Sequence, residues 1–288
     1  MIEYDYQALF KKQLNCKEAK MKLEKEILEN LIENLINWTK ESLESSGGKK
    51  AIIGISGGKD SSVVAALCVK ALGKDNVVGV LMPNGIQDDI SYAKELCSFL
   101  NIRSIEINIR DITNSMLDEL NQLSISSNLI KEVSEQSKIN IPPRVRMTLL
   151  YAISQSIDDS RVINTSNISE DWVGYATVYG DTAGAISPLG MLTTDEIVQI
   201  GEYLGLPDKF LSKVPSDGLT GKTDEDNLGF SYDVLNKYIR EGTIEDLDTK
   251  KTIDRMHRLS RFKFLPLPMF SPDLPIKADD IANIYKKP

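Results

Sequence analysis

The sequence has few of the residues on which several common kinds of site depend. It contains one histidine, His257, and three cysteines, Cys16, Cys68 and Cys97, in 288 residues. A single histidine argues against a histidine-based catalytic triad and against a multi-histidine metal site. The cysteines are odd in number and lack the spacing of metal ligands, so we expect free thiols in a reducing cytoplasm.

The sequence also lacks a long apolar run and an excess of basic residues. We find no run of about 18 apolar residues, so we expect no membrane-spanning helix, and the first residues contain no apolar signal-peptide core. The net charge is −8 and the pI is near 5.0, whereas a nucleic-acid partner would require a basic face. We therefore expect a cytoplasmic protein whose partners are small molecules, with no nucleic-acid or membrane partner.

Short β-branched runs alternate with helical patterns along the chain, and apolar residues make up 41% of it. The expected strands are 51–55, 77–82, 103–107 and 161–164, and the expected helices are 17–45, 63–72, 91–100, 111–120, 194–204, 230–240 and 249–260. This alternation predicts an α/β fold with a doubly wound parallel sheet flanked by helices. Ligands of such sheets bind at the carboxyl ends of the strands, where the strand order reverses.

Some segments interrupt this pattern. Residues 121–141 are polar and poorly patterned, and we expect them to form a mobile segment over the site. Pro142 and Pro143 are expected to begin the next helix. The tail, about 264–288, is rich in proline and is expected to be extended. No repeat or clear boundary divides the chain, so we expect residues 1–288 to form a single domain.

The stretch from Ser56 to Ser62, SGGKDSS, lies between the first expected strand and its helix. Two adjacent glycines let backbone N–H groups approach an anion closely, and a helix start adds unpaired donors and a positive dipole end. A tight turn with Ser61 as N-cap would explain the serine but not Asp60. A carboxylate in an anion-binding loop would repel phosphate unless a cation lies between them, so Asp60 is a candidate magnesium ligand.

A second polar segment follows the strand expected at 161–164. Thr165-Ser166-Asn167 supplies hydroxyl and amide groups suited to a nucleotide, and Glu170 opens what reads as a helix. One interpretation is a helix-capping pattern, in which Ser or Thr precedes a glutamate by a few residues. The other interpretation is a second magnesium carboxylate opposite Asp60. The residues alone leave both interpretations open.

Several stretches together closely resemble the ammonia-dependent NAD synthetases, a family within the N-type ATP pyrophosphatase superfamily. The resemblance runs from about residue 20 to 270. Its main blocks are GISGGKDSS (54–62), NIPPRVRM (140–147), NTSNISEDWVGYATVYGD (164–181), SPLGMLT (187–193), KVPSDGL (213–219) and TDEDNLGFSY (223–232). The resemblance implies an adenine nucleotide alpha hydrolase-like fold, ATP and Mg²⁺ as cofactors, and a homodimer that uses the helix at about 17–45.

The resemblance also implies a reaction and a set of residues. A carboxylate, that of deamido-NAD in the family, attacks the α-phosphorus of ATP; pyrophosphate leaves, and free ammonia converts the acyl-adenylate to an amide. Asp60 and Glu170 would be the catalytic and metal-binding residues, and the substrate would be bound by Arg144, Asp181 and Lys263. The implied ATP-binding residues are Gly54, Ile55, Ser56, Gly57, Gly58, Lys59, Asp60, Ser61, Ser62, Thr165 and Ser216.

The departures from the family pattern fall mostly on the substrate side. Where the family has a lysine, an acidic residue and a histidine that contact deamido-NAD, this chain has Val178, Ala185 and Phe262. A lysine that meets ATP phosphates in many members is Thr194 here. These changes are explained either by drift with the same substrate or by a paralogue that adenylates and amidates a different carboxylate.

Two further interpretations of the sequence assign the protein a different function. A sulfur-transfer enzyme acting on tRNA can use the same loop, but it would need reactive cysteines and a basic face. A non-catalytic family member is disfavoured because Asp60 and Glu170 are both present.

Overall fold

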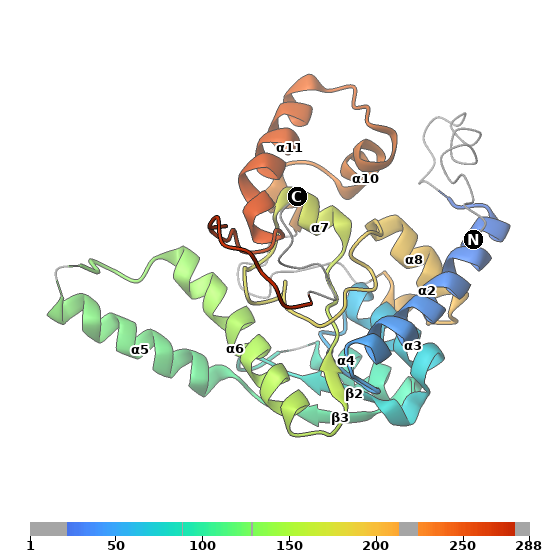
Figure 1. Ribbon diagram of the computed structural model, residues 1–288, viewed down its shortest axis with the longest axis horizontal. Helices are drawn as coiled ribbons and strands as arrows, with labels where there is room; N and C mark the ends of the chain where they lie inside the picture. Colours follow the sequence, from blue (N-terminus) through green and yellow to red (C-terminus); the bar gives the residue numbers. More distant parts are fainter. Residues whose placement is uncertain (1–21, 88, 128, 213–223, 280–288) are drawn as a thin grey trace.

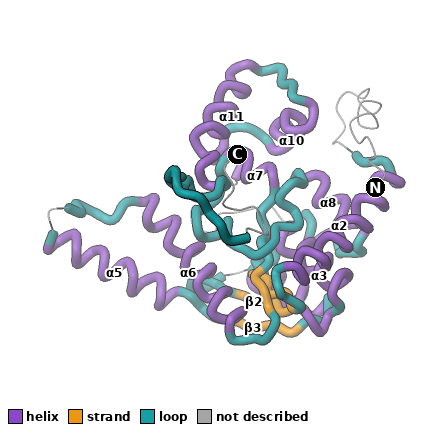
Figure 2. Tube along the Cα trace, viewed as in Figure 1, coloured by secondary structure: helices purple, strands orange, loops and turns teal. Residues whose placement is uncertain are grey.

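A four-stranded parallel sheet forms the centre of the molecule. The computed structural model describes residues 22–87, 89–127, 129–212 and 224–279. The strand order is β3-β2-β1-β4, with β1 at Lys50–Gly54, β2 at Val77–Leu81, β3 at Arg103–Glu106 and β4 at Ser160–Val162. Figure 2 shows these strands with helices on either side. The order reverses after β1, because β4 pairs with the other edge of that strand.

Helices cover both faces of this sheet, which confirms the doubly wound α/β fold. One face carries α2 (Lys25–Ser45), α3 (Lys59–Leu72), α4 (Ile90–Phe99) and α8 (Thr194–Tyr203), and the other carries α5 (Arg110–Ser126) and α6 (Glu135–Gln155). Alternate residues of β1 feed the two cores: Ala51 and Ile53 pack with the first group, and Ile52 with the second. Its three central residues, Ala51, Ile52 and Ile53, are all apolar and buried, as expected of a parallel strand covered on both faces.

A third apolar cluster lies beside the sheet body. It joins α7 (Ile168–Val173), α9 (Asp224–Leu228), α10 (Tyr232–Glu241) and α11 (Leu247–Ser260). Figure 1 shows α10 and α11 stacked beyond α7. Short 3₁₀ turns complete the described elements at Lys74–Asn76, Asp208–Phe210 and Arg261–Lys263.

Most of the segment 121–141, for which the sequence showed no clear pattern, is helical. Helix α5 continues to Ser126, and α6 begins at Glu135, where the Ser134 side chain accepts a hydrogen bond from the Ser137 amide. Figure 1 shows the two helices extending outward from one side of the molecule. Pro142 and Pro143 lie inside α6 and do not begin it. The Ser134 cap starts the helix earlier, and burial of Pro142 against the core offsets the lost backbone donors.

The structure describes part of the helix expected at 17–45 and part of the tail expected at about 264–288. Helix α2 begins at Lys25, later than the expected 17, and residues 1–21 lie outside the described part. From 264 to 279 the chain contains no helix or strand, and its side chains are exposed from 265 onward. Among the described residues, no helix is long and apolar enough to cross a membrane.

A buried ion pair should hold α10 to α8. Arg240 donates to both carboxylate oxygens of Glu196 at 2.7 and 2.6 Å, and the Glu196 side chain is 4% exposed. We expect Arg240→Met to lower the free energy of unfolding by about 3–5 kcal/mol, because it leaves a buried carboxylate without its cation. Urea denaturation measures the loss. The control is Lys251→Met, which breaks an exposed ion pair with Asp248 and should lower the free energy of unfolding by only about 0–1 kcal/mol. Equal losses of stability in the two variants would contradict this account.

The described cysteines should be unreactive. Cys68 and Cys97 are buried in α3 and α4, and burial raises the pKa of the Cys68 thiol to about 12 and that of Cys97 to about 11. Both thiols are therefore protonated at neutral pH, and the thiol form is not the nucleophile. In a Cys16→Ser background, we expect Ellman's reagent to label the native protein only after urea is added. Rapid labelling without urea would restore the sulfur-transfer reading.

Candidate active site

Residues 56–62, which we call the phosphate loop or β1 loop, connect β1 directly to α3. Helix α3 begins at Lys59, with Gly58 as its N-cap, four residues before the expected start at Val63. Gly57 has a φ of +79°, and a Cβ there would lie 3.0 Å from the Ala93 amide nitrogen. Both facts favour glycine at this position. The early helix start places Asp60 and Ser61 in the first turn, beside the positive end of the helix dipole.

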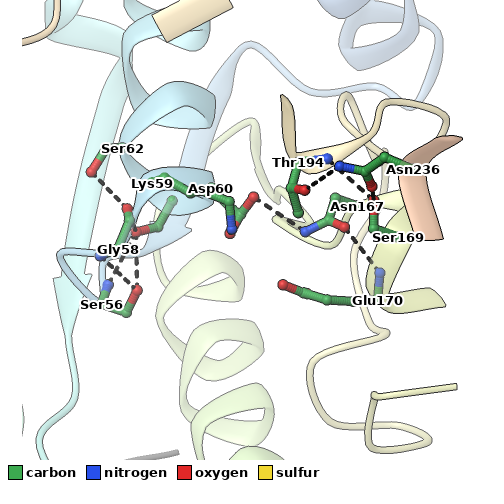
Figure 3. A network of polar contacts seen from close by, with 11 residues as sticks. Ser56, Gly58, Lys59, Asp60, Ser62, Asn167, Ser169, Glu170, Thr194 and Asn236 are labelled. Carbon is green, nitrogen blue, oxygen red and sulfur yellow. Dashed lines mark hydrogen bonds and ion pairs between the residues drawn. The ribbon is translucent and has the colours of Figure 1, made fainter. Parts of the chain in front are cut away.

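Serine hydroxyls hold the loop in this shape. The Ser61 hydroxyl donates to the Gly58 carbonyl at 3.1 Å and accepts from the Ser56 amide at 3.3 Å. The Ser56 hydroxyl accepts from the Gly58 amide at 3.2 Å, and Ser62 donates to the Gly58 carbonyl at 2.7 Å (Figure 3). The N-cap interpretation of Ser61 is therefore wrong: Gly58 occupies that position, and the hydroxyls close the loop on itself.

Asp60 is held through both carboxylate oxygens. The Lys59 ammonium lies 3.0 Å from Oδ2, and the Asn167 carboxamide donates to Oδ1 at 3.2 Å. Lys59 is 8% exposed, so it is buried beside its neighbour and is not a solvated surface residue. The Asn167 contact joins the β1 loop to the segment that follows β4.

Helix α7 begins at this contact. Asn167 is the N-cap, and its side-chain oxygen accepts from the Glu170 amide at 3.0 Å. The sequence therefore correctly indicated a helix cap at 165–170. The capping residue, however, is Asn167 and not one of the neighbouring serines or Thr165. The cap engages the main chain of Glu170, so capping and a metal role for the glutamate are compatible.

The two loops enclose a polar cavity of about 190 Å³. Its lining residues are Ser56, Asp60, Ser61, Thr165, Ser166, Glu170, Tyr175, Ala176 and Asp181. The structure thus brings together seven residues named from the sequence, from the β1 loop, from the β4 end and from the turn at 181. Sequence reasoning missed Tyr175 and Ala176. Both lie in the matching stretch 164–181, but nothing in the pattern indicates which residues of that stretch face inward.

Asp181 forms the far wall of the cavity. One carboxylate oxygen accepts from the Thr177 amide at 2.6 Å, and the main-chain carbonyl accepts from the Asn164 carboxamide at 2.7 Å. The side chain is open to solvent, yet the protein atoms around it raise its pKa by desolvation. The same cause raises the pKa of Asp171 on α7 to about 7, and the charge of Asp181 adds to it.

The two cations expected to bind substrate, Arg144 and Lys263, both contact main-chain carbonyls. Arg144, which is exposed on α6, donates to the Val178 carbonyl at 3.2 Å. Lys263 donates to the Gly174 and Ala176 carbonyls at 2.8 and 2.7 Å, and burial lowers its pKa. Neither belongs to the described lining of the cavity. In this structure both side chains hold the turn at 174–178 in place beside the cavity.

The departures from the family pattern have different surroundings. Val178 is half-buried, Ala185 is exposed and Phe262 is 69% exposed. Thr194 is buried: its hydroxyl accepts from the Asn236 carboxamide at 2.8 Å, and this contact ties α8 to α10. A lysine side chain would not fit such a contact. Ser216, the remaining ATP-binding candidate, lies outside the described residues.

The donor set of the cavity fits Mg²⁺ carried with a nucleotide. Asp60 and Glu170 supply carboxylates and Ser56 and Thr165 supply hydroxyls, all of them oxygen ligands. The described part of the chain holds no group of three or more His, Cys, Asp or Glu side chains that could bind a metal ion. Mg²⁺ commonly binds through one or two carboxylates together with substrate phosphates, which matches two carboxylates beside a phosphate loop.

Comparison with known proteins gives a consistent result. Residues 31–265 match the family model described as NAD synthase. The chain is 38% identical over 215 residues to an NH₃-dependent NAD⁺ synthetase from Methanococcus aeolicus, covering 73% of this chain and 82% of that protein.

Two solved structures have the same fold. An NMN synthetase from Francisella tularensis superposes with a TM-score of 0.75 at 31% identity, covering 86% of this chain and 99% of that one. An NH₃-dependent NAD synthetase from Campylobacter jejuni gives a TM-score of 0.67 at 29% identity, covering 84% and 98%. With a family model that matches most of its length, this chain belongs to the NAD synthase family, whose members are ATP-using ligases.

Proposed function

We propose that this protein is an ammonia-dependent NAD synthetase, which joins ammonia to the carboxyl group of deamido-NAD and splits ATP into AMP and pyrophosphate. The observation that carries the proposal is the meeting of Asp60 and Glu170 at one polar cavity, with the phosphate loop between β1 and α3 beside them. Family membership supplies the reaction class, and this geometry supplies the means to perform it.

The first step is attack of the substrate carboxylate on the α-phosphorus of ATP. A bond forms between the carboxylate oxygen and phosphorus, and the bond to the bridging oxygen of pyrophosphate breaks. We assign the leaving pyrophosphate to the amides of Ser56–Ser62, where the helix dipole and unpaired N–H groups favour negative charge. We assign Asp60 and Glu170 to Mg²⁺, which when bound neutralises charge on the phosphoryl oxygens.

The second step is attack of ammonia on the acyl-adenylate. The new bond joins nitrogen to the carbonyl carbon, and AMP leaves with the oxygen that came from the carboxylate. Asp181 lies in the cavity wall, and its pKa is raised by the surrounding protein. We assign this carboxylate to holding the incoming ammonium and accepting its proton, because a raised pKa makes a carboxylate a better base.

We also propose that Thr165 contacts ATP from the β4 side of the cavity. We further propose that the protein is a homodimer and that it is cytoplasmic. The inner face of α2 packs through Ile32 and Leu43 into the sheet body. Its outer face, with Trp38 at 45% exposure, remains for a partner copy. Buried, protonated thiols at Cys68 and Cys97 are compatible with a reducing compartment.

A second candidate substrate is nicotinate mononucleotide, which would give NMN as the amide. Two observations favour it: one protein of this fold is described as an NMN synthetase, and this chain lacks polar groups at Val178, Ala185 and Phe262. Losing a charged hydrogen bond typically costs about 1.5–3 kcal/mol, so three losses would weaken dinucleotide binding severely unless other contacts compensate.

Asp60→Ala should abolish pyrophosphate release from ATP. Removing a charge-stabilising group in the transition state typically slows a reaction by about 10²–10³-fold, and this variant removes a proposed metal ligand. The measurement is coupled detection of pyrophosphate with Mg²⁺, ATP, ammonium and deamido-NAD. Asp75→Ala, which removes an exposed carboxylate on the 3₁₀ turn at Lys74–Asn76, is the control and should leave the rate unchanged. Retained turnover in Asp60→Ala would rule out its metal role.

The two candidate substrates can be separated by comparing kcat/KM. We expect deamido-NAD to give the higher value, with NAD as the product identified by chromatography. The triple variant Val178→Lys, Ala185→Asp, Phe262→His should then change NAD formation by less than about tenfold, because existing contacts already bind the dinucleotide. A large gain in the triple variant, together with a higher native kcat/KM for nicotinate mononucleotide, would show that the native site is built for the smaller substrate.

A further inference from the structure

The Asn167 side chain connects the carboxylate of Asp60 to the main chain of Glu170. It is completely buried, at 0% exposure. Its Nδ2 donates to Asp60 Oδ1 at 3.2 Å, and its Oδ1 accepts from the Glu170 amide at 3.0 Å. Figure 3 shows its carboxamide between these residues, with the Glu170 side chain directed toward the loop side. One planar group thus fixes the β1 loop relative to the start of α7.

A carboxamide suits this place better than any other side chain of its size. It carries a donor and an acceptor on one plane, whereas an ionised aspartate has no donor for Asp60, and a serine is too short to reach Asp60 from the start of α7. A capping role alone would need only the acceptor, and Ser, Thr, Asp and Asn all provide one. The burial of the Nδ2 donor against a carboxylate is therefore the feature that capping does not explain.

The contact also limits how Asp60 can turn. With Lys59 at Oδ2 and Asn167 at Oδ1, rotation about the carboxylate would break a charge-assisted hydrogen bond. Asp60 held in this way lines the same cavity as Glu170. A site held in this way does not have to reorganise when a cation and phosphates arrive, which favours both binding and catalysis.

We propose that Asn167 is a positioning residue, whose carboxamide sets the spacing and orientation of Asp60 and Glu170 before Mg²⁺ and nucleotide bind. The inference rests on the proposed metal role of these two carboxylates. It assigns to Asn167 a function in metal affinity that is separate from its function as the N-cap of α7.

Two variants separate the bridge from the cap. Asn167→Ser keeps an N-cap oxygen and loses the reach to Asp60, whereas Asn167→Ala loses both. The control is Asn236→Ser: Asn236 is also buried, at 1% exposure, and bonds to Thr194 and Ser169 but to no carboxylate. The probe is Mn²⁺ titrated into the full-length protein with α,β-methylene-ATP, followed by electron paramagnetic resonance, so no turnover is needed. Thermal denaturation of each variant reports its folding.

We expect Asn167→Ser and Asn167→Ala to weaken Mn²⁺ binding alike, by about tenfold or more, the range of a lost charge-assisted hydrogen bond. Asn236→Ser should lower the melting temperature and leave Mn²⁺ affinity unchanged. In turnover assays, kcat of Asn167→Ser should fall while KM for the carboxylate substrate stays within about twofold.

Other outcomes overturn the inference. Native-like Mn²⁺ affinity in Asn167→Ser, with a loss only in Asn167→Ala, would leave Asn167 a helix cap and nothing more. An equal loss in Asn236→Ser would make the effect one of general destabilisation. If the unsubstituted protein binds no Mn²⁺ with the nucleotide, the metal role fails and the inference fails with it. If Mn²⁺ binds as expected but no NAD forms, only the proposed reaction is wrong.

Discussion

The reversal of strand order between β1 and β4 is the constraint on which the site depends. Because β4 pairs with β1 in parallel, both strands end at the same edge of the sheet. The β1 loop enters α3, and the segment after β4 enters α7. The cavity lined by Asp60 and Glu170 is formed where these two segments meet.

The start of α3 carries both groups that attract phosphate and a carboxylate that repels it. The first turn of α3 presents N–H groups and a positive dipole end, which favour phosphate. The same turn carries Asp60, which without a cation would oppose phosphate. Lys59 and Asn167 satisfy this carboxylate in the described structure. Such an arrangement is stable in the absence of nucleotide and still offers oxygen ligands to a cation that arrives with one.

The sequence predicted the parts of this arrangement that rest on apolar patterning and on glycine. The β-branched run at 51–55 and the alternation of elements are confirmed by the sheet and its two covering layers. The start of α3 was misplaced because its first turn, KDSS, is polar and hides the helical period. The start of α6 was misplaced because proline usually marks the first turn of a helix, while here burial and an earlier cap outweigh that preference.

The contacts of polar side chains were less predictable. From its residue type and position, Asn167 was predicted only to be a polar group near the nucleotide. Its contacts with Asp60 and Glu170 depend on how two loops that are distant in sequence meet. The family resemblance implies that Arg144 and Lys263 bind substrate, and it gave no indication that each bonds to carbonyls of the turn at 174–178. A motif fixes which residues are present, while the partners of a long flexible cation depend on the surrounding main chain.

The central claim is that this site activates a carboxylate at the α-phosphorus of ATP, and isotope transfer tests it most directly. The measurement uses deamido-NAD labelled with ¹⁸O in its nicotinate carboxyl group, together with ATP, Mg²⁺ and ammonium, and analyses the products by mass spectrometry. The account predicts that each AMP carries one ¹⁸O atom from the carboxylate and that pyrophosphate is unlabelled. Formation of ADP with ¹⁸O in inorganic phosphate would place the attack at the γ-phosphorus and contradict it.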